Sequence, residues 1–247
     1  MSTSTLIGLA LIALAAFTTE GAIGFGGTVL CASVGAQLVP LDVLLPAFVV
    51  LNIVLSSWLL VRGLPVVAWR LLAVEVAPAV GIGAAIGLAL FHLPGQTWMV
   101  LVFALFVIAL AMLQLVRPAT GELPPAPRIG LLALGGIAHG LFGTGGPMIV
   151  YVVRRRLPDQ RAFRATLAVL WLVLNAALLV NFASAGLFVK PVYDVMTVLA
   201  ITIVPGLALG EQIHRRLNAA RFEGAVWVLL LLAGLALAIR TAISVSS

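Results

Sequence analysis

The sequence predicts an all-α integral membrane protein built from two inverted repeats, each a broken, re-entrant helix hairpin followed by three transmembrane helices. Three observations lead to this fold class: the apolar composition, six apolar runs of membrane-spanning length, and a glycine cluster repeated in the two halves of the chain. Hydrophobic residues make up 63% of the 247 residues and charged residues 9%, whereas a soluble domain is about half apolar and about a quarter charged. The composition therefore excludes a water-soluble fold.

Six apolar runs are long enough, at about 20 helical residues, to cross the hydrocarbon core of a bilayer. They lie at 42–61, 71–91 and 97–116 in the first half and at 163–185, 192–211 and 222–239 in the second. The two other apolar regions, 5–40 and 129–153, are each interrupted by a glycine cluster with a polar residue just before it. Such interruptions are typical of broken helices at membrane depth.

The two glycine clusters belong to an internal repeat. The segment from Glu20 to Thr28 aligns without gaps on the segment from His139 to Pro147, and four glycines match in nine positions. In a later span of each half a proline stands five residues before a glycine, at 78 and 83 and at 205 and 210. We therefore predict a first repeat at 1–119, a cytoplasmic linker at 120–128 and a second repeat at 129–247.

The basic residues predict how the hairpins are oriented. If every apolar region crossed the membrane once, eight arginines would face six basic residues on the other side. If each broken region entered and left on one side, the division would be twelve against two, which the positive-inside rule favours. Hairpin arms of about a dozen residues, such as 6–17 and 28–39, would reach about 18 Å, roughly mid-membrane. A hairpin and three spans make an odd number of crossings, so the second repeat is inverted and both termini are periplasmic.

The two breaks predict a binding site for a small anion. Non-helical backbone at membrane depth must be buried or line a watery cavity, so we expect both breaks at the centre of the bundle. The second arms begin at Thr28 and Pro147, and a helix N-terminus offers free N–H groups and about half a positive charge. The predicted substrate-binding residues are Gly24, Phe25, Gly26, Gly27, Thr28, Gly143, Thr144, Gly145, Gly146, Pro147, Asn52 and Asn175. The alternative role for the two asparagines is a hydrogen bond between helices.

Three ionisable residues are candidates for coupling to a proton or another ion: Glu20, His139 and Glu75. An ionisable group at membrane depth is a functional candidate because charging it there is expensive. Structural roles are the alternatives. Glu20 would cap N–H groups of its own break, His139 would hydrogen-bond a carbonyl, and Glu75 would pair with Arg70 near the membrane surface.

Two further features are expected along the substrate path. Trp171 lies deep in its span, whereas most of the other tryptophans stand near span ends, where indole rings favour the interface. The arginines at 154–156, 161 and 164 anchor the cytoplasmic side and contact anionic lipid. Attraction of the substrate to the inner mouth is a secondary role for them.

Other classes of function find little support. Cys31 is the only cysteine, which excludes a disulfide within the chain, and neither His92 nor His214 has a second ligand at metal-binding spacing. We expect no cofactor and no enzyme, because Glu20 and His139 alone make a weak case for catalysis. The basic residues lie between apolar runs, so nucleic acid is not an expected partner. The expected partners are a small anionic substrate, a coupling proton or ion and membrane lipids, and the composition is compatible with a homo-oligomer.

The two breaks share the form G-x-G-G, at 24–27 and 143–146, and each opens a four-segment half. In this the chain resembles the TauE/SafE family of sulfite exporters, also described as the 4-toluene sulfonate uptake permease family. The resemblance covers essentially the whole chain. It implies an inner-membrane permease for sulfite, sulfoacetate or other small sulfur-containing anions, coupled to a proton or ion. Thr28 departs from the commonest family pattern, which has a small residue or proline there, as at Pro147.

The mechanism expected for two inverted repeats is alternating access. The direction of transport and the choice among sulfur-containing anions stay open at this point. Two alternatives to a transporter also stay open: an anion channel, in which facing half-helices line a pore, and a non-transporting membrane scaffold.

Overall fold

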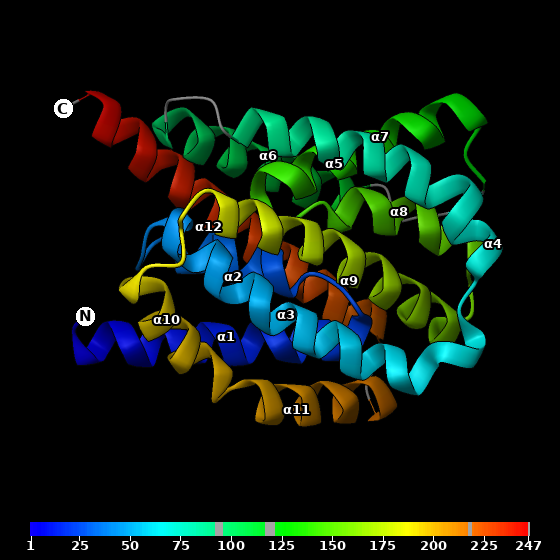
Figure 1. The fold of residues 1–247 in the computed structure, drawn as a ribbon, viewed down its shortest axis with the longest axis horizontal. Helices are drawn as coiled ribbons and strands as arrows, with labels where there is room; N and C mark the ends of the chain where they lie inside the picture. The colour runs from blue at the N-terminus through cyan, green and yellow to red at the C-terminus, as the bar shows by residue number, and fades with distance from the viewer. Residues whose placement is uncertain (92–95, 117–121, 217–218, 247) are drawn as a thin grey trace.

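The computed structural model describes residues 1–91, 96–116, 122–216 and 219–246, and these residues form helices without any strand. Most of the helices lie side by side along the long axis of the molecule (Figure 1). In chain order they are α1 (Thr3–Ile23), α2 (Gly27–Gly35), α3 (Leu41–Gly63), η1 (Leu64–Val66), α4 (Trp69–Leu71), η2 (Leu72–Val76), α5 (Ala77–Phe91), α6 (Gln96–Val116), α7 (Pro125–Phe142), α8 (Gly146–Arg156), α9 (Gln160–Ser184), α10 (Lys190–Ala200), α11 (Ile203–Arg216) and α12 (Ala219–Ser246).

Four helical stretches among the described residues are long and apolar enough to cross a membrane, namely Thr3–Ile23, Leu41–Val66, Trp69–Phe91 and Gln160–Ser184. The bent pair α10 and α11 makes a fifth if it counts as one span. Helices α6 and α12 cover the predicted runs at 97–116 and 222–239. Some of their side chains lie outside the described residues, so these two spans stay predictions. The described chain is therefore all-α, with four or five candidate membrane spans.

The first hairpin differs from the expected pair of half-length arms. Helix α1 runs for 21 residues, about 31 Å at 1.5 Å per residue, so the prediction of an arm of about a dozen residues at 6–17 is wrong. No proline interrupts it, and it ends only where Gly24 takes a left-handed φ of 85° and its N–H bonds the Glu20 carbonyl. The returning arm α2 has nine residues and remains short.

The second hairpin is built in the same way. Helix α7 has 18 residues and begins at Pro125, inside the segment predicted as the linker. It ends at Gly143, which has a φ of 65° and bonds the His139 carbonyl. Helix α8 then runs for 11 residues. In both halves, therefore, a long helix ends at a left-handed glycine and a shorter helix follows it.

The two hairpins point in opposite directions along the long axis of the bundle (Figure 1). Helix α1 runs from the left end of the view toward the right, and α2 returns to the left end. Helix α7 starts at the right end, and α8 returns there. Both chain termini lie at the left end. Each hairpin therefore begins and ends at one end of the molecule, and the two hairpins use opposite ends.

Two predicted spans are irregular at equivalent prolines. Residues Leu72–Val76 form a π-helical turn directly before Pro78, and α10 and α11 meet at a 43° bend just before Pro205. Proline lacks the N–H that the helix ladder needs, and its ring clashes with the carbonyl four residues earlier. The run at 71–91 therefore remains one helical stretch with a π-helical turn, whereas the run at 192–211 is divided at a bend, where ordinary spans were expected.

Close glycine contacts hold these irregular spans against the long arm of the opposite hairpin. A Cβ placed on Gly140 of α7 would lie 2.5 Å from the carbonyl oxygen of Ala84 in α5. A Cβ placed on Gly210 of α11 would lie 2.6 Å from the carbonyl oxygen of Thr18 in α1. Small residues let membrane helices approach to backbone contact. Helix α5 is thereby packed on α7, and α11 on α1.

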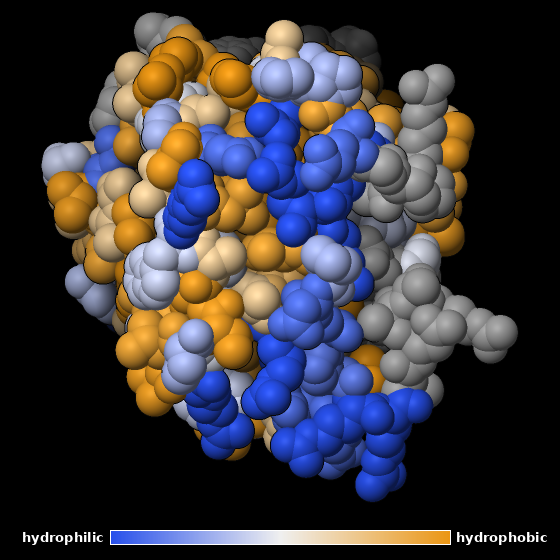
Figure 2. Space-filling model, turned by 90° about the vertical axis from the view of Figure 1, so that its right-hand side faces the viewer, coloured by the Kyte–Doolittle hydropathy of each residue, from blue (hydrophilic) through white to orange (hydrophobic). Residues whose placement is uncertain are grey.

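Most of the described basic side chains gather at one end of the molecule. In Figure 1 the α3–α4 connection, the start of α7, the α8–α9 connection and the end of α11 all lie at the right end. Figure 2 shows this end as a face with strongly hydrophilic side chains. The described arginines in these segments are Arg62, Arg70, Arg128, Arg154, Arg155, Arg156, Arg161, Arg164, Arg215 and Arg216. The positive-inside rule predicts that an arginine-rich end of this kind faces the cytoplasm.

Candidate functional site

A small buried cavity of about 20 Å³ lies between the two helix breaks. Such a volume holds about one water molecule. Its lining comes from both hairpins and from the two helices α3 and α9 that follow them. The lining residues are Glu20, Phe25, Gly26, Thr28, Val29, Asn52, His139, Gly143, Thr144, Gly146, Trp171 and Asn175. We call this space the central cavity.

Both short arms begin at the central cavity. Helix α2 starts after Gly26, whose φ is 89°, and helix α8 starts at Gly146. Neither N-terminus is capped by a side-chain hydrogen bond. The first N–H groups of a helix have no partner within the helix, so an uncapped start leaves donors for a ligand or for water. Two such starts point donors at one small space.

Glu20 is held in this space by asparagine. The Nδ2 atom of Asn52 donates to both carboxyl oxygens of Glu20, at 2.8 and 2.9 Å. The Oδ1 atom of Asn52 accepts from Asn175 at 2.8 Å and from Ser56 at 3.2 Å. Glu20, Asn52 and Asn175 are all almost fully buried. One network therefore joins the first break to α3 and α9.

His139 occupies the equivalent position in the second half but has different contacts. Its ring stacks on the indole of Trp171, with centroids 5.9 Å apart. The same separation of 32 residues joins Glu20 to Asn52 and His139 to Trp171. Neither ring nitrogen has a hydrogen-bond partner among the described residues by standard geometry, although the Asn175 amide lies beside the ring.

Two more polar groups complete the lining. The Oγ1 atom of Thr144 is buried and has no partner among the described residues. The hydroxyl of Thr28 lies 3.5 Å from the Asn52 amide, at the limit of a hydrogen bond. Buried donors and acceptors are normally satisfied, and an exception calls for water or a ligand. The cavity thus offers neutral donors around a single acidic group.

The structure brings most of the predicted substrate-binding residues together around the cavity. Three predicted glycines belong to the breaks but do not line it. Gly24 faces Arg164, a Cβ on Gly27 would meet the Glu20 carboxylate, and a Cβ on Gly145 would meet the Gly135 backbone. The side chain of Pro147 lies outside the described residues.

Several structural roles considered for the ionisable residues are absent. Among the described residues, Glu20 caps no N–H group of its break and accepts from Asn52 instead. His139 bonds no carbonyl. Glu75 lies in the π-helical turn and pairs with Arg156 at 3.0 Å and Arg128 at 3.6 Å. The expected pairing of Glu75 with Arg70 is therefore wrong, and Glu75 takes no part in the cavity.

Two lining residues were not among the predicted site residues. Trp171 carries a detectable signal, since it lies deep in a span, and its Nε1 atom donates to the Gly24 carbonyl at 3.1 Å. Val29 is an ordinary apolar residue one position after Thr28, and nothing in its type marks it. Within the described part of the chain there is also no group of three histidine, cysteine or acidic side chains arranged to hold a metal ion.

Comparison with known proteins gives two matches. The family model described as "Sulfite exporter TauE/SafE" matches residues 9–237. A protein of Comamonas testosteroni named "Probable inner membrane transporter protein TsaS" is 26% identical over 174 residues, which cover 69% of this chain and 72% of that protein. No solved structure gives a significant match.

Proposed function

The chain belongs to the TauE/SafE sulfite exporter family and is therefore a multi-pass inner-membrane transporter; we propose that it carries small sulfur-containing anions such as sulfite, sulfoacetate or related organosulfonates. The anion would be held in the central cavity, between the N-termini of α2 and α8, and the cavity would widen from its volume of about 20 Å³ to admit it. The observation that carries this proposal is that both uncapped helix starts face one buried cavity. Oriented N–H groups and the positive ends of two helix dipoles favour an anion there without any lysine or arginine.

Glu20 is the proposed site of the coupling proton. Its carboxyl group lines the cavity in which the anion would bind. A carboxylate and an anionic substrate repel each other strongly in a buried site, whereas a protonated carboxyl group can donate to the anion. Anion and proton would therefore bind together. His139, on the opposite break, is the second candidate for the same role.

The two halves are proposed to be inverted repeats that rock against each other in alternating access. Several regularities support this. Helix α2 begins at Gly27 and α8 at Gly146, and α3 begins at Leu41 and α9 at Gln160, so both pairs are 119 residues apart. The packing of α1 on α11 matches the packing of α7 on α5 when the halves are exchanged. The opposite directions of the two hairpins fit the same symmetry.

Cysteine labelling tests this topology in a Cys31→Ala background. We expect Glu122→Cys and Pro158→Cys, both exposed positions, to react with an impermeant maleimide only in inside-out vesicles. Ala185→Cys, exposed on the α9–α10 connection, should react only in right-side-out cells. Each variant is its own control in the two vesicle orientations. Reaction of Glu122→Cys and Pro158→Cys from opposite sides would exclude the inverted hairpins.

Counterflow tests the transport function itself. Proteoliposomes preloaded with unlabelled sulfoacetate should accumulate labelled sulfoacetate transiently above equilibrium, because a carrier exchanges one bound anion for another. A cavity of only about 20 Å³ between the breaks favours a carrier of this kind over a wide pore. A channel would equilibrate the label without an overshoot, and a scaffold would give the flux of protein-free liposomes. Loading with sulfite or acetate in parallel measures selectivity.

A further inference from the structure

A second, larger cavity of about 430 Å³ opens at the arginine-rich end of the molecule. Its walls come from the end of α3, η1, the start of α9 and the end of α11. Its charged lining residues are Arg62, Arg161, Arg164, Arg215 and Glu211. We call it the inner vestibule. Four guanidinium groups against one carboxylate leave a strong excess of positive charge in a concave space, which concentrates anions.

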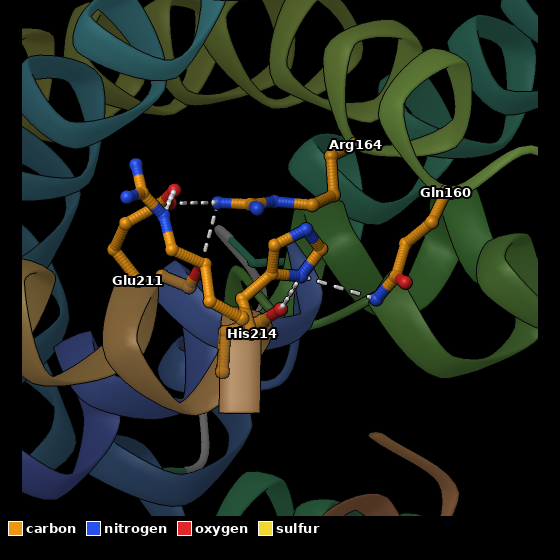
Figure 3. Close-up of polar contacts among 7 residues, drawn as sticks. Gln160, Arg164, Glu211 and His214 are labelled. Atoms are coloured by element: carbon orange, nitrogen blue, oxygen red, sulfur yellow. Dashed lines mark hydrogen bonds and ion pairs between the residues drawn. The ribbon is translucent and has the colours of Figure 1, made fainter. Parts of the chain in front are cut away.

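Arg164 is the innermost of these arginines. Its side chain is about one-eighth exposed, at 12%. One terminal nitrogen donates to the Gly21 carbonyl at 2.6 Å and lies 3.6 Å from the Glu211 carboxylate. The Nε atom is buried and has no partner among the described residues. Figure 3 shows the Arg164 side chain reaching from α9 toward Glu211 on α11.

Two polar neighbours of Arg164, namely His214 of α11 and Gln160 of α9, also contact the first break or each other. His214 lies 3.0 Å from the Ala22 carbonyl and 3.2 Å from the Gln160 amide, both through Nδ1. Figure 3 shows Gln160 and His214 pointing toward each other beside Arg164. The last carbonyls of α1 are thus held by side chains of α9 and α11. Glu211 is shared, because Arg215 also binds it at 3.0 Å.

The first break forms the wall between the inner vestibule and the central cavity. On the vestibule side, a Cβ placed on Gly24 would lie 2.9 Å from the Arg164 side chain. On the other side, the Gly24 carbonyl accepts from Trp171, which lines the central cavity. Arg164 and Trp171 are seven residues apart and therefore lie on one face of α9. Movement of Arg164 would act directly on this wall.

The polar cluster formed by Gln160, Arg164, Glu211 and His214 has no counterpart in the other half. By the 119-residue offset, Gln160 and Arg164 correspond to Leu41 and Leu45, and Leu45 is buried. By the 127-residue offset between Pro78 and Pro205, Glu211 and His214 correspond to Ala84 and Gly87. The four equivalent positions in the first half therefore carry no polar side chain. Because one half packs without these groups, the fold does not require them, and a function at the inner mouth explains them better.

We propose that the inner vestibule is a second binding site for one small oxyanion, with Arg164 as its main ligand and as the gate to the central cavity. The arginine fork matches the oxygens of a sulfonate or sulfite group. An arriving anion would replace Glu211 as the partner of Arg164. The guanidinium would then leave the Gly21 carbonyl and release the first break. This inference rests on the proposed transport of sulfur-containing anions.

Protection of a vestibule cysteine from alkylation tests the site. Val66 lines the vestibule and is 42% exposed, so Val66→Cys in the Cys31→Ala background should react with N-ethylmaleimide. In nanodiscs of phosphatidylcholine we expect sulfoacetate to slow this reaction, relative to chloride at equal ionic strength. Arg164→Gln should raise the half-protecting concentration by about tenfold or more, because it removes a charge-assisted contact. Glutamine is too short to replace the donor to the Gly21 carbonyl, so a second variant covers the case in which the break does not fold.

Three variants make the result specific. Glu211→Gln should lower the half-protecting concentration, since it removes the competing carboxylate, and it tests the site even if Arg164→Gln fails to fold. Arg216→Gln, an exposed arginine at the same end that does not line the vestibule, should leave it unchanged. Gly146→Val, which alters the central cavity, should also leave protection intact.

Protection that disappears with Gly146→Val but survives Arg164→Gln would report the central cavity alone and would overturn the proposal. Absence of protection by sulfoacetate alongside normal counterflow would overturn it while leaving the transport function intact. Protection by phosphatidylglycerol nanodiscs without sulfoacetate would make the vestibule a lipid site and would also overturn it. Protection with no counterflow would support the vestibule site and refute the proposed transport.

Discussion

Replacement of Gly146 by valine is expected to abolish anion binding in the central cavity while leaving the fold and the inner vestibule intact. Gly146 opens α8 and lines the central cavity, and the nearest atoms to a Cβ placed there belong to the Trp171 ring, at 3.8 Å. The first methyl groups would therefore enter the cavity without meeting backbone. A side chain in a space of about 20 Å³ leaves no room for an anion beside it. We expect the Kd to rise about a hundredfold or more, equivalent to about 3 kcal/mol.

The measurement is binding of labelled sulfoacetate to purified protein in an Arg164→Gln background, in which the vestibule no longer contributes, together with its effect on thermal stability, since a ligand of the folded state raises the melting temperature. Gly130→Val is the matched control, because a Cβ at this α7 glycine meets nothing within 4 Å. Gly145→Val is unsuitable, since its Cβ would collide with the Gly135 backbone and disturb the hairpin itself. Wild-type affinity in Gly146→Val would remove the central cavity from the binding site.

Conversion of Glu20 to glutamine is expected to abolish accumulation driven by a pH gradient while counterflow persists. Glutamine has nearly the volume of glutamate and retains an oxygen that accepts from Asn52, so the network across α3 should stay assembled. The glutamine amide cannot bind or release a proton between acidic and neutral pH. A permanently neutral group resembles the protonated carboxyl group, which is the form proposed to accept the anion. Exchange of anions should therefore continue without coupling.

Proteoliposomes with an acidic exterior and a neutral interior provide the test. Wild-type protein should accumulate labelled sulfoacetate under the gradient, and Glu20→Gln should reach only the level found without a gradient. Glu122→Gln, an exposed carboxylate outside the spans, is the control and should behave as wild type. Gradient-driven accumulation that survives in Glu20→Gln would place the coupling proton elsewhere, with His139→Gln as the next variant to measure.

The sequence alone determined the class of the protein and the location of its breaks. Composition and run length depend only on how much apolar surface each segment carries, so the membrane helices could be predicted without a structure. Glycines at 24, 26 and 143 adopt positive φ, which other residues rarely do, so the clusters predicted local helix ends correctly. The 119-residue offset between Glu20 and His139 recurs in the starts of α2 and α8 and of α3 and α9.

Helix lengths near the breaks could not be predicted from the sequence as reliably as the positions of the breaks. A helix at a buried hairpin continues until its backbone is forced to turn, and the residues between 17 and 24 contain nothing that forces this in α1. The 43° bend before Pro205 had a visible cause in the proline. Its consequence, a span divided into α10 and α11, depended on whether neighbouring helices would stabilise the break.

Only the tertiary structure decided which side chains meet. Glu20 and Asn52 are 32 residues apart and Arg164 and Gly21 are 143 residues apart, and no local pattern selects such pairs. They follow from the faces that α1, α3, α9 and α11 turn toward one another, which close glycine contacts set. Glu75 shows the converse. It pairs with Arg128 of α7 and Arg156 of α8, which are distant in sequence, and not with Arg70, which is near. Sequence periodicity specifies how apolar a helix face is, whereas its partners depend on the packing of the whole bundle.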